Sequence, residues 1–175
     1  MGVRYRTALL RQRKGARRQP DRCREQGLHR HHAELQPGAV GHVGRRLWLR
    51  QGLPRRAIAY ARERHTFGKP LIANQVVRHR LVDMAMRINA VKSTLELLAY
   101  RVGQGEKPVA EICMLKNLAT GAMEFCANEA MQIFGGAGYL RGAKVERIYR
   151  ETKVMSIGGG SVEIMKDLAA RQMGL

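Results

Sequence analysis

The sequence predicts an all-α fold, an up-and-down four-helix bundle that follows an irregular, arginine-rich N-terminal extension. Two long stretches place apolar residues at intervals of three or four, which is the period of a helix that buries one face. Nowhere do apolar and polar residues alternate between turn residues, as they would in a half-buried strand. Two long helices of similar length predict an antiparallel hairpin, and shorter helices after them complete a bundle.

The N-terminal segment, residues 1–44, has neither the period of a helix nor that of a strand. Its Arg, Gln, His, Gly and Pro content cannot supply a core. Residues 1–56 contain 15 Lys and Arg against 3 acidic residues, so they carry most of the net charge of +18. We therefore predict two parts. The first is an arginine-rich head at 1–44, disordered or non-homologous, and the second is a helical bundle at 45–175.

The bundle is expected to begin with the end of a helix at residues 57–63, which leads into a turn at 66–70. Residues 47–60 have a faint helical spacing. Pro54 interrupts it, because proline removes a helix hydrogen bond and kinks the element. We therefore expect the helix to be broken at this proline.

Two long helices and two shorter ones follow the turn. The first long helix covers residues 75–102 and ends at Gly103-Gln104-Gly105, a stop signal followed by a turn. Pro108 opens the second, at a position where its missing N–H has no cost. Shorter helices are expected at about 143–154 and 162–173. The stripes of the long helices are Val77, Leu81, Met84, Ala85, Ile88, Val91, Leu95, Leu98 and Val102, and Ile112, Leu115, Ala119, Ala122, Cys126, Ala130 and Ile133.

The three cysteines, Cys23, Cys113 and Cys126, form no C-x-x-C pair. Cys113 and Cys126 lie among apolar residues of one predicted helix, which favours buried free thiols over a metal or redox role. No metal site is predicted. A reducing, cytoplasmic setting fits these thiols. No apolar run is long enough to span a membrane.

Three motifs carry the information about function. They are YARERHTFGKPL at residues 60–71, QIFGGAGYLRG at 132–142 and RETKVMSIGGGSVEIMKDLAAR at 150–171. In this order and spacing they resemble the C-terminal helical domain of the flavin-dependent acyl-CoA dehydrogenases, over residues 57–175. The resemblance implies part of an FAD site in a homo-oligomeric enzyme that oxidises acyl-CoA to 2,3-enoyl-CoA.

The resemblance also implies which residues approach the FAD. Arg64 and Thr66 would reach the pyrophosphate, often that of a flavin held by the neighbouring subunit, and a guanidinium makes paired charge-assisted hydrogen bonds to phosphate oxygens. Gln132, Gly135 and Gly136 would approach the adenine and ribose side across a subunit interface. The remaining implied contacts are Asn74, Gln75, Ser161, Val162 and Glu163.

Each of these residues also has a structural explanation that the sequence leaves open. Arg64 could be a solvated arginine beside a turn. Asn74 and Ser161 stand where helix N-caps are expected, and Gly135 where a helix C-cap is expected. Glu163 in the first turn of a helix favours the helix dipole. Structural and ligand-binding roles are compatible at these positions.

The catalytic base is the main departure from the family pattern. Many members have a glutamate immediately before the Gly-Ser or Gly-Thr pair, where this chain has Gly159. Glycine cannot remove a proton. A minority, similar to the isovaleryl- and long-chain-type enzymes, have glycine here and take the glutamate from an earlier helix. Glu34 is the nearest acidic candidate in the head, but its surroundings do not resemble that helix. The base is therefore unassigned, and the chain alone is expected to be inactive.

Two other functions stay open at this stage. A basic, nucleic-acid-binding helical protein would use the arginines of the head on phosphate backbones. Against it, the sequence has no signature of a nucleic-acid-binding fold, and Tyr5 and Trp48 are the only aromatic residues before Tyr60. A helical bundle without a ligand is the other alternative, and retention of FAD on purification would separate it from a flavoprotein.

Overall fold

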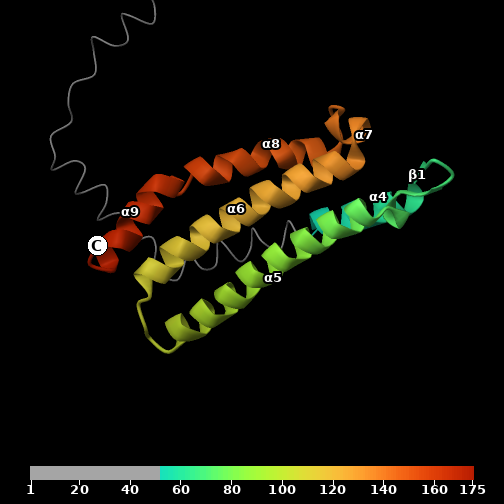
Figure 1. The fold of residues 1–175 in the computed structure, drawn as a ribbon. Coiled ribbons are helices and arrows are strands. Elements are labelled where there is room, and N and C mark those ends of the chain that lie inside the picture. The colour runs from blue at the N-terminus through green and yellow to red at the C-terminus, as the bar shows by residue number, and fades with distance from the viewer. Residues whose placement is uncertain (1–51) are drawn as a thin grey trace, which may run out of the picture. The chain divides into compact units, whose positions relative to one another are not determined.

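The computed structural model describes residues 52–175, all of which belong to one unit (Figure 1). Most of these residues lie in five long helices, and four short elements connect them. The helices are α4 (Gly52–Glu63), α5 (Gln75–Gly103), α6 (Val109–Phe134), α8 (Lys144–Ile157) and α9 (Val162–Gln172), and the short elements are β1 (His65–Thr66), β2 (Lys69–Pro70), the 3-10 turn η1 (Leu71–Ala73) and α7 (Gly136–Tyr139). The all-α prediction is confirmed. The predicted head, 1–44, lies outside the described residues.

The two long helices begin and end close to where the sequence places them. Pro108 immediately precedes α6, and Gly105 in the turn before it has a positive φ of +87°. Arg101 closes this turn, because its guanidinium pairs with Glu106 at 2.7 Å and with Glu111 at 3.0 Å. The pKa of Glu111 is lowered, first by its own backbone N–H and then by Arg101. The turn thus joins α5 and α6 through both backbone and charge.

Pro54 does not break its helix, which corrects the prediction for this region. Within the described residues α4 begins at Gly52, so Pro54 lies in the first turn of the described helix. The first N–H groups of a helix have no partner inside it, and a proline therefore removes no hydrogen bond there. In the same helix, Leu53, Ala57 and Ala61 are spaced by four residues and are buried on one face.

The turn after α4 contains a two-stranded hairpin that the sequence did not predict. β1 and β2 are antiparallel, with His65 opposite Pro70 and Thr66 opposite Lys69. Phe67 and Gly68 form its tip, both with positive φ. Two residues per strand are too few to show an alternating pattern in the sequence.

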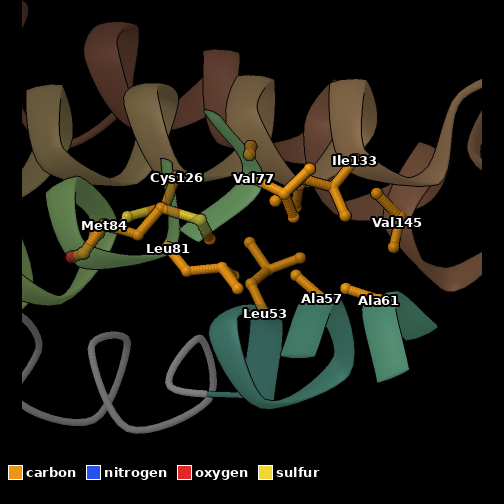
Figure 2. Close-up of a cluster of buried hydrophobic side chains, with 11 residues drawn as sticks. Leu53, Ala57, Ala61, Val77, Leu81, Met84, Cys126, Ile133 and Val145 are labelled. Atoms are coloured by element: carbon orange, nitrogen blue, oxygen red, sulfur yellow. Dashed lines mark hydrogen bonds between the residues drawn. The ribbon is translucent and has the colours of Figure 1, made fainter. Parts of the chain in front are cut away.

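Helix α6 is the centre of the bundle. It packs against α5 on one side and against α8 and α9 on another, and Figure 1 shows α8 and α9 following one another along it. The α4 end of the bundle holds the largest core cluster, in which Leu53, Met84 and Ala127 are almost fully buried (Figure 2). A second cluster joins α5 to the N-terminal half of α6, and a third joins α6 to α9.

A glycine segment separates α8 from α9. Gly159 and Gly160 have φ values of +70° and +95°, which L-residues rarely adopt. The chain bends here, and both helices stay against α6. None of the helices in the described residues is long and apolar enough to cross a membrane.

Candidate functional site

Two of the three motifs meet at one end of the bundle. The Tyr60 ring stacks on Phe134 with 4.2 Å between ring centroids, and its hydroxyl donates a 3.3 Å hydrogen bond to the Phe134 carbonyl oxygen. These residues are 74 positions apart in the sequence. The contact places the end of α4 and the hairpin beside the C-terminus of α6. It therefore connects the Arg64 motif with the Gln132 motif.

Arg64 has a fixed main chain and an available side chain. Its N–H donates to the Tyr60 carbonyl oxygen at 2.8 Å, and its carbonyl oxygen accepts from the Leu71 N–H at 2.7 Å. The side chain is exposed, and its guanidinium has no hydrogen-bond or ion-pair partner among residues 52–175. A guanidinium held in this way can bind an anion without first breaking an ion pair. Thr66, two residues further along β1, is half-buried.

Asn74 and Gln75 lie at the start of α5, close to the hairpin in the sequence. Asn74 occupies the N-cap position, but its side chain makes no capping hydrogen bond and donates instead to the Leu71 carbonyl oxygen at 3.1 Å. The expected side-chain cap is therefore absent at Asn74. The Gln75 amide is 3.3 Å from His79 Nε2. Both amides thus already have a partner within their own segment.

The C-terminal turn of α6 is open on its outer side. Gln132 is exposed, and Gly135 is the C-cap with φ +58° and ψ −142°. A Cβ added at Gly135 or at Gly136 would have nothing within 4 Å, whereas one at Gly138 would lie 2.7 Å from the Phe134 Cβ. Internal packing therefore requires a glycine at 138. Position 135 favours a glycine because of its positive φ. The space beside Gly135 and Gly136 is free.

The third motif is at the N-terminus of α9. Ser161 is the N-cap, and its hydroxyl accepts a 3.4 Å hydrogen bond from the Ile164 N–H. The pKa of Glu163 is lowered, first by its own backbone N–H and then by the Ser161 hydroxyl. Val162 is half-buried as the first residue of the helix. The capping role expected for Ser161 is therefore present.

The predicted site residues fall into two groups rather than one. Arg64, Thr66, Gln132, Gly135 and Gly136 belong to the end joined by Tyr60 and Phe134, with Asn74 and Gln75 following the hairpin. Ser161, Val162 and Glu163 are held instead against α6 near Asn117, which donates to the Val162 carbonyl oxygen at 3.0 Å. At about 1.5 Å of rise per residue, the length of α6 from Asn117 to Gly135 is about 27 Å.

The glycine segment before Ser161 has no carboxylate at the position where the family often has its base. Gly159 is exposed, and a Cβ there would have nothing within 4 Å. Gly160 differs, because a Cβ there would lie 2.7 Å from the Met165 sulfur. A side chain at position 159 would thus enter open space, whereas one at position 160 would meet the core.

Three residues near these groups were not among the candidates from the sequence. Phe67 at the tip of the hairpin is fully exposed and has a positive φ of 51°. Lys116 and Asn117 in α6 donate hydrogen bonds to the segment around Ser161. The Phe-Gly pair in a turn is a local signal that could have indicated Phe67. No local signal indicates Lys116 or Asn117, because their partners are more than forty residues away.

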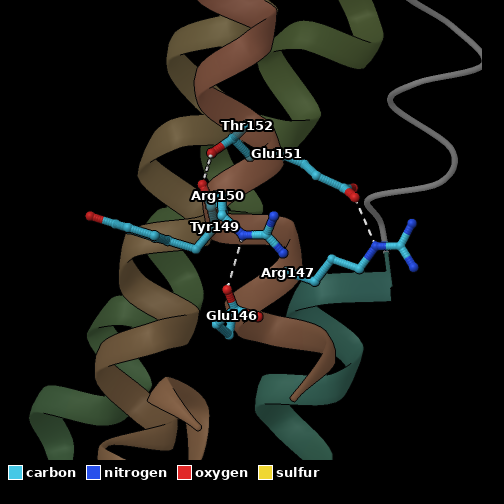
Figure 3. Close-up of polar contacts among 6 residues, drawn as sticks. All are labelled: Glu146, Arg147, Tyr149, Arg150, Glu151 and Thr152. Atoms are coloured by element: carbon cyan, nitrogen blue, oxygen red, sulfur yellow. Dashed lines mark hydrogen bonds and ion pairs between the residues drawn. The ribbon is translucent and has the colours of Figure 1, made fainter. Parts of the chain in front are cut away.

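The charged face of α8 is an ordinary helix surface. Arg147 pairs with Glu151 at 2.7 Å and Arg150 with Glu146 at 3.1 Å, each four residues apart (Figure 3). Exposed pairs of this kind contribute little to stability. In the described part of the chain, no group of three or more His, Cys, Asp or Glu could hold a metal ion.

The fold and the three motifs define a helical domain with an available cation and an open glycine turn at one end. A family described as acyl-CoA dehydrogenase, C-terminal domain, matches residues 25–174. The chain therefore belongs to the acyl-CoA dehydrogenase family and contains its C-terminal domain. The match begins inside the segment that we separate as an arginine-rich head. The boundary at residue 45 stays a prediction, because the described residues begin at 52.

Individual relatives agree with this assignment. An acyl-CoA dehydrogenase of Bacillus subtilis is 33% identical over 147 residues, which are 84% of this chain and 39% of that protein. The structure of an acyl-CoA dehydrogenase from Geobacillus kaustophilus has a TM-score of 0.77 at 29% identity, over 82% of this chain and 38% of the other. The FAD complex of PigA has a TM-score of 0.66 at 28% identity, over 79% and 34%. The chain thus spans less than two fifths of the length of the curated relatives it matches first.

Proposed function

We propose that this chain is the helical flavin-binding domain of an FAD-dependent acyl-CoA dehydrogenase, with Arg64 as the main anchor of the FAD pyrophosphate. The observation that carries the proposal is the guanidinium of Arg64, which is unpaired among residues 52–175 and follows the Tyr60–Phe134 contact with the end of α6. Its backbone is fixed by the hydrogen bonds to Tyr60 and Leu71. A phosphate oxygen can therefore be bound with little reorganisation of the protein.

The residues at this end fit an FAD in their chemistry. Arg64 supplies charge, and the Thr66 hydroxyl and the Gln132 amide supply uncharged hydrogen-bonding groups. The free space at Gly135 and Gly136 allows a ligand to approach the backbone closely. When bound, FAD supplies the hydride acceptor for the oxidation of acyl-CoA to 2,3-enoyl-CoA. The part that these residues play is to bind and orient it.

We do not assign the catalytic base to a residue of this chain. Gly159 cannot take the α-proton of an acyl-CoA, and no other residue here is placed in that role. Positioned bases contribute about 10² to 10⁴-fold to such reactions. We therefore expect the chain alone to reduce no artificial electron acceptor with acyl-CoA and added FAD, above a control without the thioester.

Titration of FAD into the complete chain tests the Arg64 anchor. Arg64→Gln should weaken FAD binding about tenfold or more, because a charge-assisted hydrogen bond is lost. Arg62→Gln is the matched control, since it removes the same charge one residue before the end of α4 and should change the affinity less than about twofold. Equal losses in the two variants would contradict the anchor and indicate attraction by net charge alone. A folded wild-type chain that binds no FAD would contradict the proposed function.

The separation of the two groups supports a shared flavin. Ser161, Val162 and Glu163 lie about 27 Å along α6 from Gly135, and an FAD bound at both groups of one chain would have to extend over most of that helix. We propose that each FAD instead contacts the Arg64 end of one copy and the Ser161 segment of another. The chain would then bind FAD as a homo-oligomer with closed symmetry.

Mixing two defective chains tests this arrangement. Arg64→Gln and Ser161→Ala chains each damage every site when alone. In mixed dimers, one of the two sites takes Arg64 from one chain and Ser161 from the other, and is intact. Random mixing should therefore restore roughly a quarter of the sites. No recovery after joint refolding, with mixed dimers confirmed by mass, would contradict the shared site.

The outer face of α5 supports self-association independently. Val82, Met86, Leu97 and Tyr100 are more than half exposed, and at 100° per residue they lie opposite the buried stripe of the same helix. Apolar groups gathered on one face favour contact with another protein surface. We propose that a second copy of the chain covers this face.

We also propose that the protein works in the cytoplasm. Cys113 and Cys126 are buried, free thiols, and burial raises the pKa of both. Neither needs an oxidising compartment. Fractionation of the native cells with an antibody to the chain would test this location.

A further inference from the structure

Two consecutive side chains of α6 hold the backbone around Ser161. Lys116 Nζ donates a 2.6 Å hydrogen bond to the Gly160 carbonyl oxygen, and Asn117 Nδ2 donates a 3.0 Å hydrogen bond to the Val162 carbonyl oxygen. The two acceptors lie on either side of Ser161. The segment that begins α9 is thereby attached to α6 at two points.

The position of Lys116 is unfavourable for the helix it contacts. The N-terminus of a helix carries a partial positive charge, so a nearby ammonium group is repelled by it. Helix stability alone would favour an acidic or neutral residue there. The hydrogen bond to Gly160 counteracts this repulsion, because charge-assisted hydrogen bonds are stronger than neutral ones.

The neighbouring residue also carries a cost. Asn117 Oδ1 is buried and has no hydrogen-bond partner among residues 52–175. An unsatisfied buried acceptor is destabilising, and an apolar residue of the same size would avoid it. Asn117 therefore stabilises the fold less than such an apolar residue would. Its side chain instead donates a hydrogen bond to the Val162 carbonyl oxygen.

The glycines explain why such attachment matters. Gly159 and Gly160 both have positive φ, and glycine loses more conformational freedom on ordering than any other residue. Without an external constraint, this segment could place Ser161, Val162 and Glu163 in several ways. Two hydrogen bonds from a long, rigid helix select one of them.

We propose that Lys116 and Asn117 are positioning residues that set the backbone of the Ser161 segment for contact with the flavin. They act through the carbonyl oxygens of Gly160 and Val162 and do not touch the flavin themselves. This inference rests on the proposed function, because it assumes that the Ser161 segment contacts FAD. It adds two residues to the set that determines flavin binding.

The test uses four variants of the complete chain. Lys116→Met and Asn117→Leu keep most of the side-chain volume and remove the donor. Lys116→Arg keeps a positively charged donor and is expected to restore much of the function. Lys166→Met is the control, because this exposed lysine acts on the same segment by lowering the pKa of Glu163 but donates to neither carbonyl oxygen.

Two measurements are made on each variant. Amide hydrogen exchange reports the order of residues 158–165 without any flavin, and FAD titration with the flavin absorbance spectrum reports binding. We expect faster exchange in this segment and about tenfold weaker FAD binding for Lys116→Met and for Asn117→Leu. Lys116→Arg should lie close to the wild type, and Lys166→Met should change neither measurement.

The outcomes separate this inference from the proposed function. Unchanged exchange in Lys116→Met and Asn117→Leu would overturn the positioning role, whatever the affinity. Faster exchange with unaltered FAD affinity and spectrum would overturn it as well, because the residues would then be merely structural. A folded wild-type chain without FAD binding would overturn the proposed function and this role with it, while normal binding by the wild type and all variants would overturn the role alone.

Discussion

Replacing Gly160 by alanine should destabilise the chain more than the same change at Gly159. Both glycines have positive φ, +95° and +70°. A Cβ at 160 would lie 2.7 Å from the sulfur of Met165, whereas a Cβ at 159 would have nothing within 4 Å. Met165 is almost fully buried in the cluster that joins α6 to α9. The two substitutions therefore share the backbone strain and differ in the steric contact.

The magnitude follows from these two contributions. A left-handed conformation costs an L-residue about 1–2 kcal/mol, and this cost applies to both variants. Forcing extra atoms into a packed core costs about 1–3 kcal/mol, and the flexible methionine side chain favours the lower half of that range. We expect Gly160→Ala to lose about 2–4 kcal/mol of unfolding free energy and Gly159→Ala about 1–2 kcal/mol.

Urea unfolding of the complete chain, followed by circular dichroism, measures both values. The Met165→Ala background completes the test, because Gly160→Ala should cost less once the sulfur is absent. Gly159→Ala should cost the same in either background. Equal losses for the two alanine variants, or no coupling between positions 160 and 165, would refute the steric argument.

Three further predictions concern other parts of the molecule. Tyr60→Phe should lose about 0.5–1.5 kcal/mol in urea unfolding through the missing hydrogen bond to Phe134, and an unchanged value would show that the stacked rings alone join the two motifs. Leu97→Glu should reduce self-association in light scattering while stability changes by less than about 0.5 kcal/mol; unchanged association would argue against the α5 face. Burial raises the pKa of Cys126 from 9.0 to about 11, so the folded state favours the protonated thiol. This stabilisation is fully present below pH 9 and is lost as the pH rises toward 11, and the urea midpoint should fall less over this interval in Cys126→Ala than in the wild type.

The long helices were predictable because their own sequence determines them. The apolar stripe of α5 matches its buried face at Val77, Leu81, Met84, Val91 and Leu98, and Pro108 precedes α6 as expected. The prediction that Pro54 breaks its helix was wrong for a physical reason. The cost of proline depends on its distance from the first residue of the helix, and that start lies in a region without a clear period.

The candidate residues could be predicted from motifs, but which of them lie together in the structure could not. The Arg64 motif and the Gln132 motif meet through Tyr60 and Phe134, which are 74 positions apart, and through the packing of α4 on α6. Lys116 carries no motif, and its partner carbonyl oxygen belongs to a glycine segment 44 residues away. Contacts of this kind follow from how the helices pack, which local patterns do not contain.

Helix α6 connects both parts of the proposed flavin site in one rigid element. Its N-terminal half fixes the Ser161 segment through Lys116 and Asn117, and its last residues form the turn at Gly135. One residue inserted between them would rotate one end relative to the other by about 100° and shift it by about 1.5 Å. The rotation would turn the buried residues of one half away from α5, and the two ends would no longer face two flavins in the same symmetric assembly. The length of α6 is therefore a property of the site as well as of the fold.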